Sequence, residues 1–119
     1  MTSACSFPKS VRLLSRTDFL AVQNSRHRVV TSHVVFFLLH NELGGFRVGF
    51  TVSRKFGGAV ERNRIRRRLR EAVRRSLPQL AGFSVDAVAL PRTGVGTAGF
   101  SELAGDVALL VRRLQERPV

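Results

Sequence analysis

Apolar residues recur with helical spacing near the start of the chain. Ser15 is a residue type that caps helices, and Asp18, three residues later, can reach back to the cap amide. We expect a short helix from there to about residue 25, with Phe19 and Val22 on one face.

A second, longer helix is predicted over about residues 60–80. At about 100° per residue, one stripe of its surface is apolar and can pack on a sheet. The stripe consists of Ile65, Leu69, Ala72, Val73, Ser76, Leu77 and Leu80. Pro78 must lie near the last turn or shorten the helix, because proline lacks an amide hydrogen and clashes with the preceding turn.

A third helix is predicted to begin near Ser101, with Glu102 in its first turn. Its apolar positions are Leu103, Val107, Leu110, Val111 and Leu114. Its last part carries Arg112, Arg113 and Arg117, which suit the negative end of a helix. The pattern is typical of an amphipathic helix that packs on a core.

Three segments have the pattern of strands. Residues 33–40 hold a β-branched and aromatic run, and residues 46–53 alternate between apolar and polar positions. Turn residues at 41–45 separate them, so the two are expected to form an antiparallel hairpin. The third run is at 85–90, and the small residues of 93–99 predict a flexible loop.

The whole chain, residues 1–119, is predicted to form one domain. Its length suffices for a single modest core, and no repeat or long linker divides it. An apolar fraction of 44% with nine Phe is too high for a disordered chain. Residues 1–14 are expected to be loosely structured.

The charge balance indicates a polyanionic partner. Twenty Lys and Arg against eight Asp and Glu give a formal net charge of +12, and such a surface repels itself unless a polyanion neutralises part of it. Cys5 has no partner for a disulfide, and no apolar run is long enough for a membrane helix or a secretory signal. We therefore expect a cytoplasmic protein without a membrane partner.

The second helix concentrates this charge. Eight arginines lie within the fourteen residues 62–75, with only Glu61 and Glu71 nearby to neutralise them. Surface ion pairs contribute at most about 1 kcal/mol each, so they do not account for the cluster. Arginine grips phosphate with two parallel hydrogen bonds and stacks on bases. The outer face of this helix is therefore predicted to bind nucleic acid, and a membrane-surface role is disfavoured because the core needs the apolar stripe.

No catalytic or metal site is evident in the sequence. The eight acidic residues are scattered, with no close group suited to two magnesium ions. His27, His33 and His40 are spaced too irregularly for a zinc site, and the Gly57-Gly58 turn lacks the Gly-Lys-Ser/Thr ending of a Walker motif. A self-sufficient nuclease is not expected.

The segment at 46–67, FRVGFTVSRKFGGAVERNRIRR, resembles the signature of the bacterial ribonuclease P protein family. That signature is a strand ending in Ser-Arg-Lys or Ser-Lys-Lys, a Gly-containing turn with Ala-Val, and a helix that opens on Arg-Asn-Arg. The likeness is specific over residues 46–75, and elsewhere it rests on element order, length and the Asp18-Phe19 pair.

The resemblance implies a protein subunit of a ribonucleoprotein endonuclease. Members of the family bind a large catalytic RNA, which holds the catalytic magnesium ions and removes the 5′ leader of precursor tRNA. The expected partners are therefore this RNA and precursor tRNA, with no obligate protein partner. No catalytic residue and no metal site is predicted in the protein, and the resemblance implies that Mg²⁺ is bound through the RNA.

The resemblance also implies two sites. The surface for the catalytic RNA corresponds to Ser53, Arg54, Lys55, Arg62, Asn63, Arg64, Arg67, Arg68 and Arg74. A cleft between the first helix and the sheet, which receives the single-stranded leader, corresponds to Phe19, Phe37, Arg66 and Arg70. Where some members carry a second aromatic residue one turn after the first-helix Phe, this chain departs from the pattern with Gln23. A Phe on an apolar helix face is often a core residue, so the leader role of Phe19 requires an exposed ring.

The expected fold is α/β (α+β), a two-layer sandwich in the order helix, strand, strand, strand-turn, helix, strand, helix. The resemblance implies a small mixed four-stranded sheet with three helices and a ribosomal-protein-like topology. It also implies a left-handed strand-helix-strand crossover, contrary to the usual right-handed rule.

Two other classes of protein fit the composition. A ribosomal or other structural RNA-binding protein would be equally basic, but the Arg-Asn-Arg signature and a second groove for a single strand favour the ribonuclease P protein. A helix-turn-helix DNA-binding protein is disfavoured by the strands and by the absence of a compact helix pair before the basic helix.

Overall fold

The computed structural model of the chain describes residues 9–13 and 15–119. Its centre is a mixed sheet of four strands, β1 (His27–Val30), β2 (Val34–His40), β3 (Arg47–Phe50) and β4 (Val85–Pro91). The strand order is β1-β2-β4-β3, in which β2 is antiparallel to both neighbours and β3 is parallel to β4. The mixed α/β fold predicted from the sequence is confirmed.

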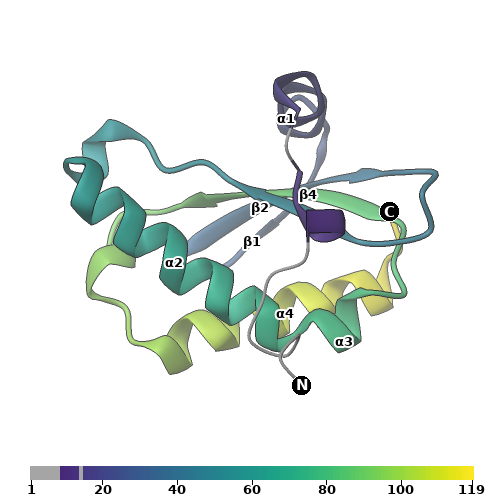
Figure 1. Cartoon of the computed structure of the whole chain (residues 1–119). Coiled ribbons are helices and arrows are strands. Elements are labelled where there is room, and N and C mark those ends of the chain that lie inside the picture. Colours follow the sequence, from purple (N-terminus) through teal and green to yellow (C-terminus); the bar gives the residue numbers. More distant parts are fainter. Residues whose placement is uncertain (1–8, 14) are drawn as a thin grey trace.

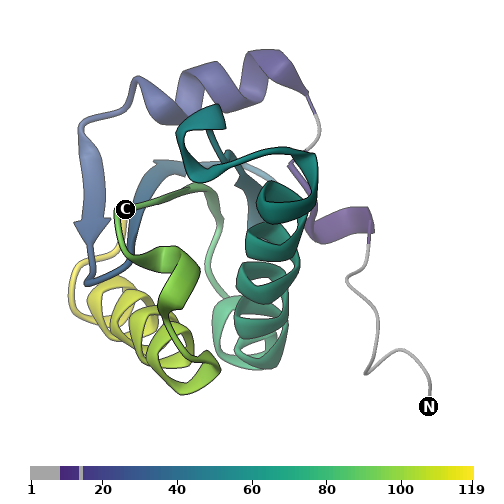
Figure 2. The same ribbon diagram turned by 90° about the vertical axis from the view of Figure 1, so that its left-hand side faces the viewer.

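Within the described residues, four α-helices cover this sheet: α1 (Arg16–Gln23), α2 (Ala59–Arg75), the short α3 (Leu77–Leu80) and α4 (Phe100–Glu116). α2, α3 and α4 lie on one face, and α1 lies across the other (Figure 1). α2 and α4 pack side by side, with β1 near α4 and on the other side of the molecule from α2 (Figure 2). The sheet therefore has a thick helical layer on one face and a single short helix on the other.

The main core lies between the sheet, α2 and α4. The inner strand β4 is buried at nearly every position, as expected for a continuous apolar run covered on both faces. The apolar stripes predicted for the two long helices are confirmed. Their buried residues include Ile65, Leu69, Ala72 and Val73 in α2, and Leu103, Val107, Leu110, Val111 and Leu114 in α4.

A smaller apolar cluster lies beneath α1. Leu13, Val22 and Val88 are buried in it, and Phe19 and Phe37 are partly buried against them. Through this cluster α1 packs on β2 and β4. Because this cluster has only a few buried residues, it covers Phe19 and Phe37 incompletely. Both rings therefore remain partly exposed to solvent.

The helix boundaries follow the predicted local signals. The Ser15 hydroxyl accepts a hydrogen bond from the Asp18 amide at 3.4 Å, so Ser15 caps α1. α2 ends at Arg75, and Pro78 stands in the first turn of α3, where the missing amide hydrogen costs nothing. Pro78 therefore shortens the long helix, as predicted.

The predicted antiparallel hairpin of residues 33–40 and 46–53 is wrong. β4 lies between β2 and β3, pairing antiparallel with the first and parallel with the second. The short connection made a hairpin the local expectation, but β4 is apolar towards both faces and takes the inner position. Alternation identifies a strand without identifying its neighbours.

The connection from β3 through α2 to β4 is a crossover between adjacent parallel strands. The left hand that the resemblance implies for this crossover stays a prediction.

Two segments are more ordered than their composition predicts. Within the segment 1–14, for which loose structure was expected, Leu13 is buried and its amide donates to the Val48 carbonyl at 3.0 Å. The remainder of that stretch, with Cys5, lies outside the described residues. The predicted flexible loop at 93–99 buries Val95 and Ala98 in the main core. Each segment contains an isolated apolar residue that packs only once the sheet is assembled.

The pattern of apolar residues does not locate β1. This strand is short, lies at an edge of the sheet and buries only Val29, so it has too few apolar positions to show a period. No helix among the described residues is long and apolar enough to cross a membrane.

Candidate nucleic-acid interface

The second helix has one buried face and one cationic face. Because its apolar stripe packs on the main core, the remaining side chains are forced outward. Asn63, Arg64, Arg67 and Arg70 are exposed, and Arg62 and Arg66 are half-buried beside the stripe. We call the exposed set of Asn63, Arg64 and Arg67 the arginine face, because Arg70 lines the hollow described below.

Several arginines of α2 have protein partners. Arg68 is half-buried and donates hydrogen bonds to the Gly96 and Ala98 carbonyls. Arg74 donates to both carboxylate oxygens of Glu71, at 2.9 and 2.6 Å. These contacts give Arg68 and Arg74, both predicted from the resemblance to bind the catalytic RNA, a structural role.

Glu71 is shared by two arginines. Arg75 also donates to it at 3.0 Å and places its guanidinium carbon 4.7 Å from the centroid of the Phe100 ring. Hydrogen bonds from Arg74 and Arg75 lower the pKa of Glu71 to about 2. The C-terminal part of α2 is therefore partly neutralised, since one carboxylate is shared by two guanidinium groups, and this distinguishes it from the arginine face.

No described ion pair involves Arg62, Arg64, Arg67 or Arg70. Arg62 even buries its Nε atom without a hydrogen-bond partner among the described residues. A group of like charges on one helix opposes folding unless something else satisfies it. The N-terminal half of α2 is thus the part of the helix that is open to a polyanion.

The segment that leads into α2 adds to this surface. Ser53, Arg54 and Lys55 are exposed, and a 3₁₀ turn at Arg54–Phe56 holds the Lys55 ammonium 5.3 Å from the centroid of the Phe56 ring. Gly57 follows with a φ of 124°, a conformation that favours glycine. The turn therefore brings Ser53, Arg54 and Lys55 to the N-terminal end of the arginine face.

A hollow of about 210 Å³ lies at the β3 edge of the sheet, between α1 and α2. It is lined by Phe19 from α1, by Arg66 and Arg70 from α2, and by Gly49 and Phe50 from β3. Three of the four residues predicted for the leader cleft therefore lie together. We call this cavity the Phe19 hollow.

The Phe19 ring rests directly on the backbone of β3. A Cβ atom added at Gly49 would lie 2.2 Å from Phe19 Cζ, well inside the contact distance of two carbon atoms. Only glycine at this position lets the ring settle against the strand. Gly49 thus sets the depth of the ring, which is half-buried and still lines the hollow.

A second hollow of about 380 Å³ lies along α1 and shares Phe19 with the first. Arg16, Leu20, Gln23 and Thr51 line it together with Phe19. Gln23, the position that departs from the family pattern, therefore lines a hollow beside Phe19. It offers an amide where some members offer an aromatic ring.

Phe37 is placed differently from the other cleft residues. It pairs with Arg28 and Val88 in the sheet and is partly buried against the cluster beneath α1. It is not among the residues that line the Phe19 hollow. The structure therefore brings together Phe19, Arg66 and Arg70 without Phe37.

A polar network holds α1 over the sheet. Arg47 donates to both carboxylate oxygens of the buried Asp86, at 2.9 and 2.6 Å, and lies 3.6 Å from the Asp18 carboxylate of α1. Asn41 donates to Asp86 at 2.8 Å. The hydrogen bond to Asp86 raises the pKa of Arg47, so this arginine stays charged. The network positions α1, and with it Phe19.

Sequence reasoning missed five of the eight residues that line the Phe19 hollow, namely Arg12, Leu13, Val48, Gly49 and Phe50. Arg12 and Leu13 lie in the segment expected to be loose, and the other three lie in the alternating segment at 46–53. A glycine between Val48 and Phe50 in a strand is a signal of close backbone approach. That signal could have identified Gly49.

The described residues contain no group of three or more His, Cys, Asp or Glu side chains that could hold a metal ion. The guanidinium groups of the interface can bind phosphates, and the half-buried ring of Phe19 can stack on a base.

These features define a small α/β protein in which a basic helix adjoins an aromatic hollow, the surface chemistry of a nucleic-acid-binding protein. The ribonuclease P family model matches residues 7–115 of the chain. The ribonuclease P protein component of Citrifermentans bemidjiense is 38% identical over 117 residues, which cover 98% of both chains. That of Caulobacter vibrioides strain NA1000 is 42% identical over 102 residues, 83% of this chain and 67% of the other.

Solved structures show the same family. The ribonuclease P protein of Thermotoga maritima superposes with a TM-score of 0.76 at 28% identity, covering 86% of this chain and 96% of the other. The chain belongs to the ribonuclease P protein family. It is thus the protein subunit of an endoribonuclease whose RNA subunit carries out catalysis, as the resemblance implied.

Proposed function

We propose that this chain binds the catalytic RNA of ribonuclease P through the arginine face and the 5′ leader of precursor tRNA through the Phe19 hollow. One observation carries the proposal: Arg66 and Arg70 of α2 line the hollow that also holds Phe19, beside the unpaired arginines of the same helix. One rigid helix would then contact two RNA elements at once.

The arginine face supplies the longer contact. Arg64, Arg67 and Asn63 are exposed on consecutive turns, and Ser53, Arg54 and Lys55 extend the surface at its N-terminal end. Guanidinium groups without acidic partners are free to form paired hydrogen bonds with phosphates. We place Arg68 and Arg74 outside the proposed contact, because their guanidinium groups bond to carbonyls and to Glu71.

The Phe19 hollow suits a single strand. A half-buried ring can stack on a base of any identity, and the two arginines beside it can hold the backbone. Single-stranded binding of this kind has little sequence preference, which fits a leader whose sequence differs between precursors. Mg²⁺ is proposed to be held through the RNA subunit.

The test compares precursor tRNAs that carry leaders of increasing length with mature tRNA, all bound to the holoenzyme. Wild-type protein should raise the affinity for precursor over mature tRNA, and the gain should grow with leader length until the hollow is filled. Phe19→Leu keeps an apolar side chain but removes the stacking ring. It should reduce the precursor affinity at least severalfold, since one base stack contributes about 1–3 kcal/mol.

Phe37→Leu is the matched control for this variant. Phe37 is also partly buried against the cluster beneath α1, but it does not line the hollow. It should leave the preference for precursor over mature tRNA unchanged. Equal loss with both variants, or an equal loss for both tRNAs, would contradict the proposed leader site.

A further inference from the structure

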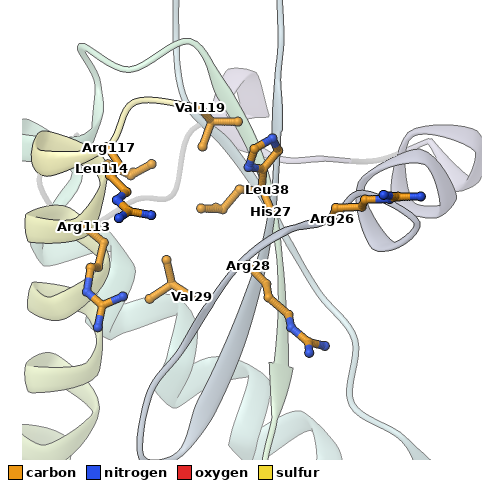
Figure 3. Close-up of a pocket in the computed structure, with 9 residues that line it drawn as sticks. All are labelled: Arg26, His27, Arg28, Val29, Leu38, Arg113, Leu114, Arg117 and Val119. Atoms are coloured by element: carbon orange, nitrogen blue, oxygen red, sulfur yellow. The ribbon is translucent and has the colours of Figure 1, made fainter.

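A second basic site lies at the opposite edge of the sheet from the arginine face. A hollow of about 270 Å³ opens between β1 and the C-terminal end of α4, and Figure 3 shows its lining. Its polar lining consists of Arg26, His27, Arg28, Arg113 and Arg117. We call these residues, with their hollow, the β1–α4 basic site.

The cations flank an apolar floor. Val29, Leu38 and Leu114, which are buried in the main core, form the floor, with Arg113 of α4 and Arg117 just after α4 on one side. The guanidinium groups of Arg26 and Arg28 extend from the β1 side away from α4 (Figure 3). β1 is an edge strand, so a ligand can approach it from the open side of the sheet.

No described side chain pairs with the cations of this site. No acidic side chain lines the hollow, and no described ion pair or hydrogen bond involves the guanidinium group of Arg26, Arg28, Arg113 or Arg117. The negative end of α4 amounts to about half a charge, which is too little for four arginines. The negative end of α4 also does not account for Arg26, which precedes β1, or for Arg28 in β1.

The chemistry of the site selects a phosphate ligand. Arginine is the residue type best suited to bind phosphate oxygens with paired hydrogen bonds, and here it comes from two separate elements. The hollow is slightly smaller than the ~300–1,000 Å³ cavities that enclose small organic ligands. A phosphate of a polymer that passes over the surface therefore fits better than an enclosed small molecule.

The site is separate from the interface already described. β1 and β3 are at opposite edges of the sheet, three strand spacings or ~14 Å apart. The β1–α4 basic site shares no lining residue with the Phe19 hollow or the second hollow along α1. An RNA segment bound here is therefore distinct from the one on the arginine face.

We infer that the β1–α4 basic site binds a phosphodiester segment of the catalytic RNA, different from the segment held by α2. This inference rests on the proposed function, in which the catalytic RNA is the large polyanion that remains with the protein. The protein would then lie between two RNA segments and hold them at a fixed separation. Sequence analysis assigned Arg113 and Arg117 only to the end of a packing helix.

The test uses Arg113→Gln/Arg117→Gln in the full chain, with circular dichroism to verify the fold. Affinity for the catalytic RNA without tRNA is measured from low to moderate salt. Each lost phosphate contact should reduce the slope of log affinity against log salt by about 1, so the double variant should lose about 2. The single variants Arg113→Gln and Arg112→Gln form the matched pair, because both residues are exposed on α4 and only Arg113 lines the hollow. Arg113→Gln should lose more slope than Arg112→Gln.

Chemical footprinting of the RNA separates this inference from the proposed function. Arg113→Gln/Arg117→Gln should expose one protected RNA segment, and Arg64→Gln/Arg67→Gln should expose a different one. If only the α2 variant changes protection and affinity, the inference is wrong and the proposed function stands. If wild-type protein protects no RNA, the proposed function fails. If the α4 variant weakens only precursor tRNA binding, the occupant is the substrate and the inference is overturned.

Discussion

The two faces of the sheet are covered unequally, and the difference separates stability from binding. On one face α2 and α4 bury a large core that includes Phe36, Leu69 and Leu110. On the other face α1 covers a cluster with three buried residues, and Phe19 stays half-buried there. The large core of the thick side can hold α2 rigidly, while the outer surface of α2 carries unpaired charge. The thin side leaves an aromatic ring within reach of a ligand.

The largest expected effect comes from weakening the thick side. Leu110→Ala removes a fully buried side chain between α4 and the sheet. It should lower the free energy of unfolding by about 2–5 kcal/mol, measured by urea denaturation. At low temperature, where the variant remains folded, the affinity for the catalytic RNA should be unchanged. Val22→Ala removes two methyl groups on the thin side and should lower the free energy of unfolding by about 1–2 kcal/mol. If Leu110→Ala lowers it by less than Val22→Ala, the comparison between the two sides is wrong.

The polar network beneath α1 should couple stability to leader binding. Asp86→Ala removes the acceptor of three hydrogen bonds from Arg47 and Asn41. Because these hydrogen bonds involve charged groups, we expect the free energy of unfolding to fall by about 1.5–3 kcal/mol. Because Arg47 also lies near Asp18, α1 should be held less firmly, and the preference for precursor over mature tRNA should fall as well. An unchanged preference would show that Phe19 does not depend on this network.

Gly49→Ala should act on the Phe19 hollow more than on the core. The added methyl group would lie 2.2 Å from the Phe19 ring, so the ring must move out of the hollow. We expect a loss of about 1–3 kcal/mol in stability from overpacking, and a severalfold loss of precursor affinity in the leader-length assay.

Gly105→Ala serves as the control for Gly49→Ala. Gly105 lies in α4, and an added Cβ meets nothing within 4 Å. Alanine has the higher helix propensity, so this variant should be up to about 1 kcal/mol more stable and bind precursor normally. Equal behaviour of the two variants would remove the special role assigned to Gly49.

The smallest expected effect concerns the C-terminal end of α2, where Glu71 pairs with two arginines. The pKa of Glu71 is lowered to about 2 by Arg74 and Arg75, so its contribution to stability is present above its usual pKa of 4.5. That contribution should disappear as the pH falls from about 4.5 towards 2. The difference in Tm between wild type and Glu71→Gln should therefore be present at pH 6 and shrink on acidification. A difference that does not change with pH would indicate that the pairing contributes nothing to folding.

Much of the site was determined by the sequence alone. The apolar stripe of α2 follows from helical periodicity, and it forces Asn63, Arg64 and Arg67 outward whatever the rest of the fold does. The cap of α1 and the end of α2 shortly before Pro78 are equally local, because they depend on residues a few positions apart. The segment at 46–67 also identified the family from the sequence alone, because the residues of its signature are contiguous in the chain.

The tertiary structure decided what periodicity cannot express, namely which distant residues meet. The two strands of the expected hairpin are not neighbours, because β4 is inserted between β2 and β3. Only the packing of α1 sets Phe19 on Gly49 and leaves Phe37 outside the hollow. The pairing of Arg68 with the loop carbonyls and the meeting of β1 with the end of α4 are also contacts between segments far apart in the chain. Local pattern fixes which face of an element is apolar, whereas the partner of that face depends on the free energy of the whole assembled core.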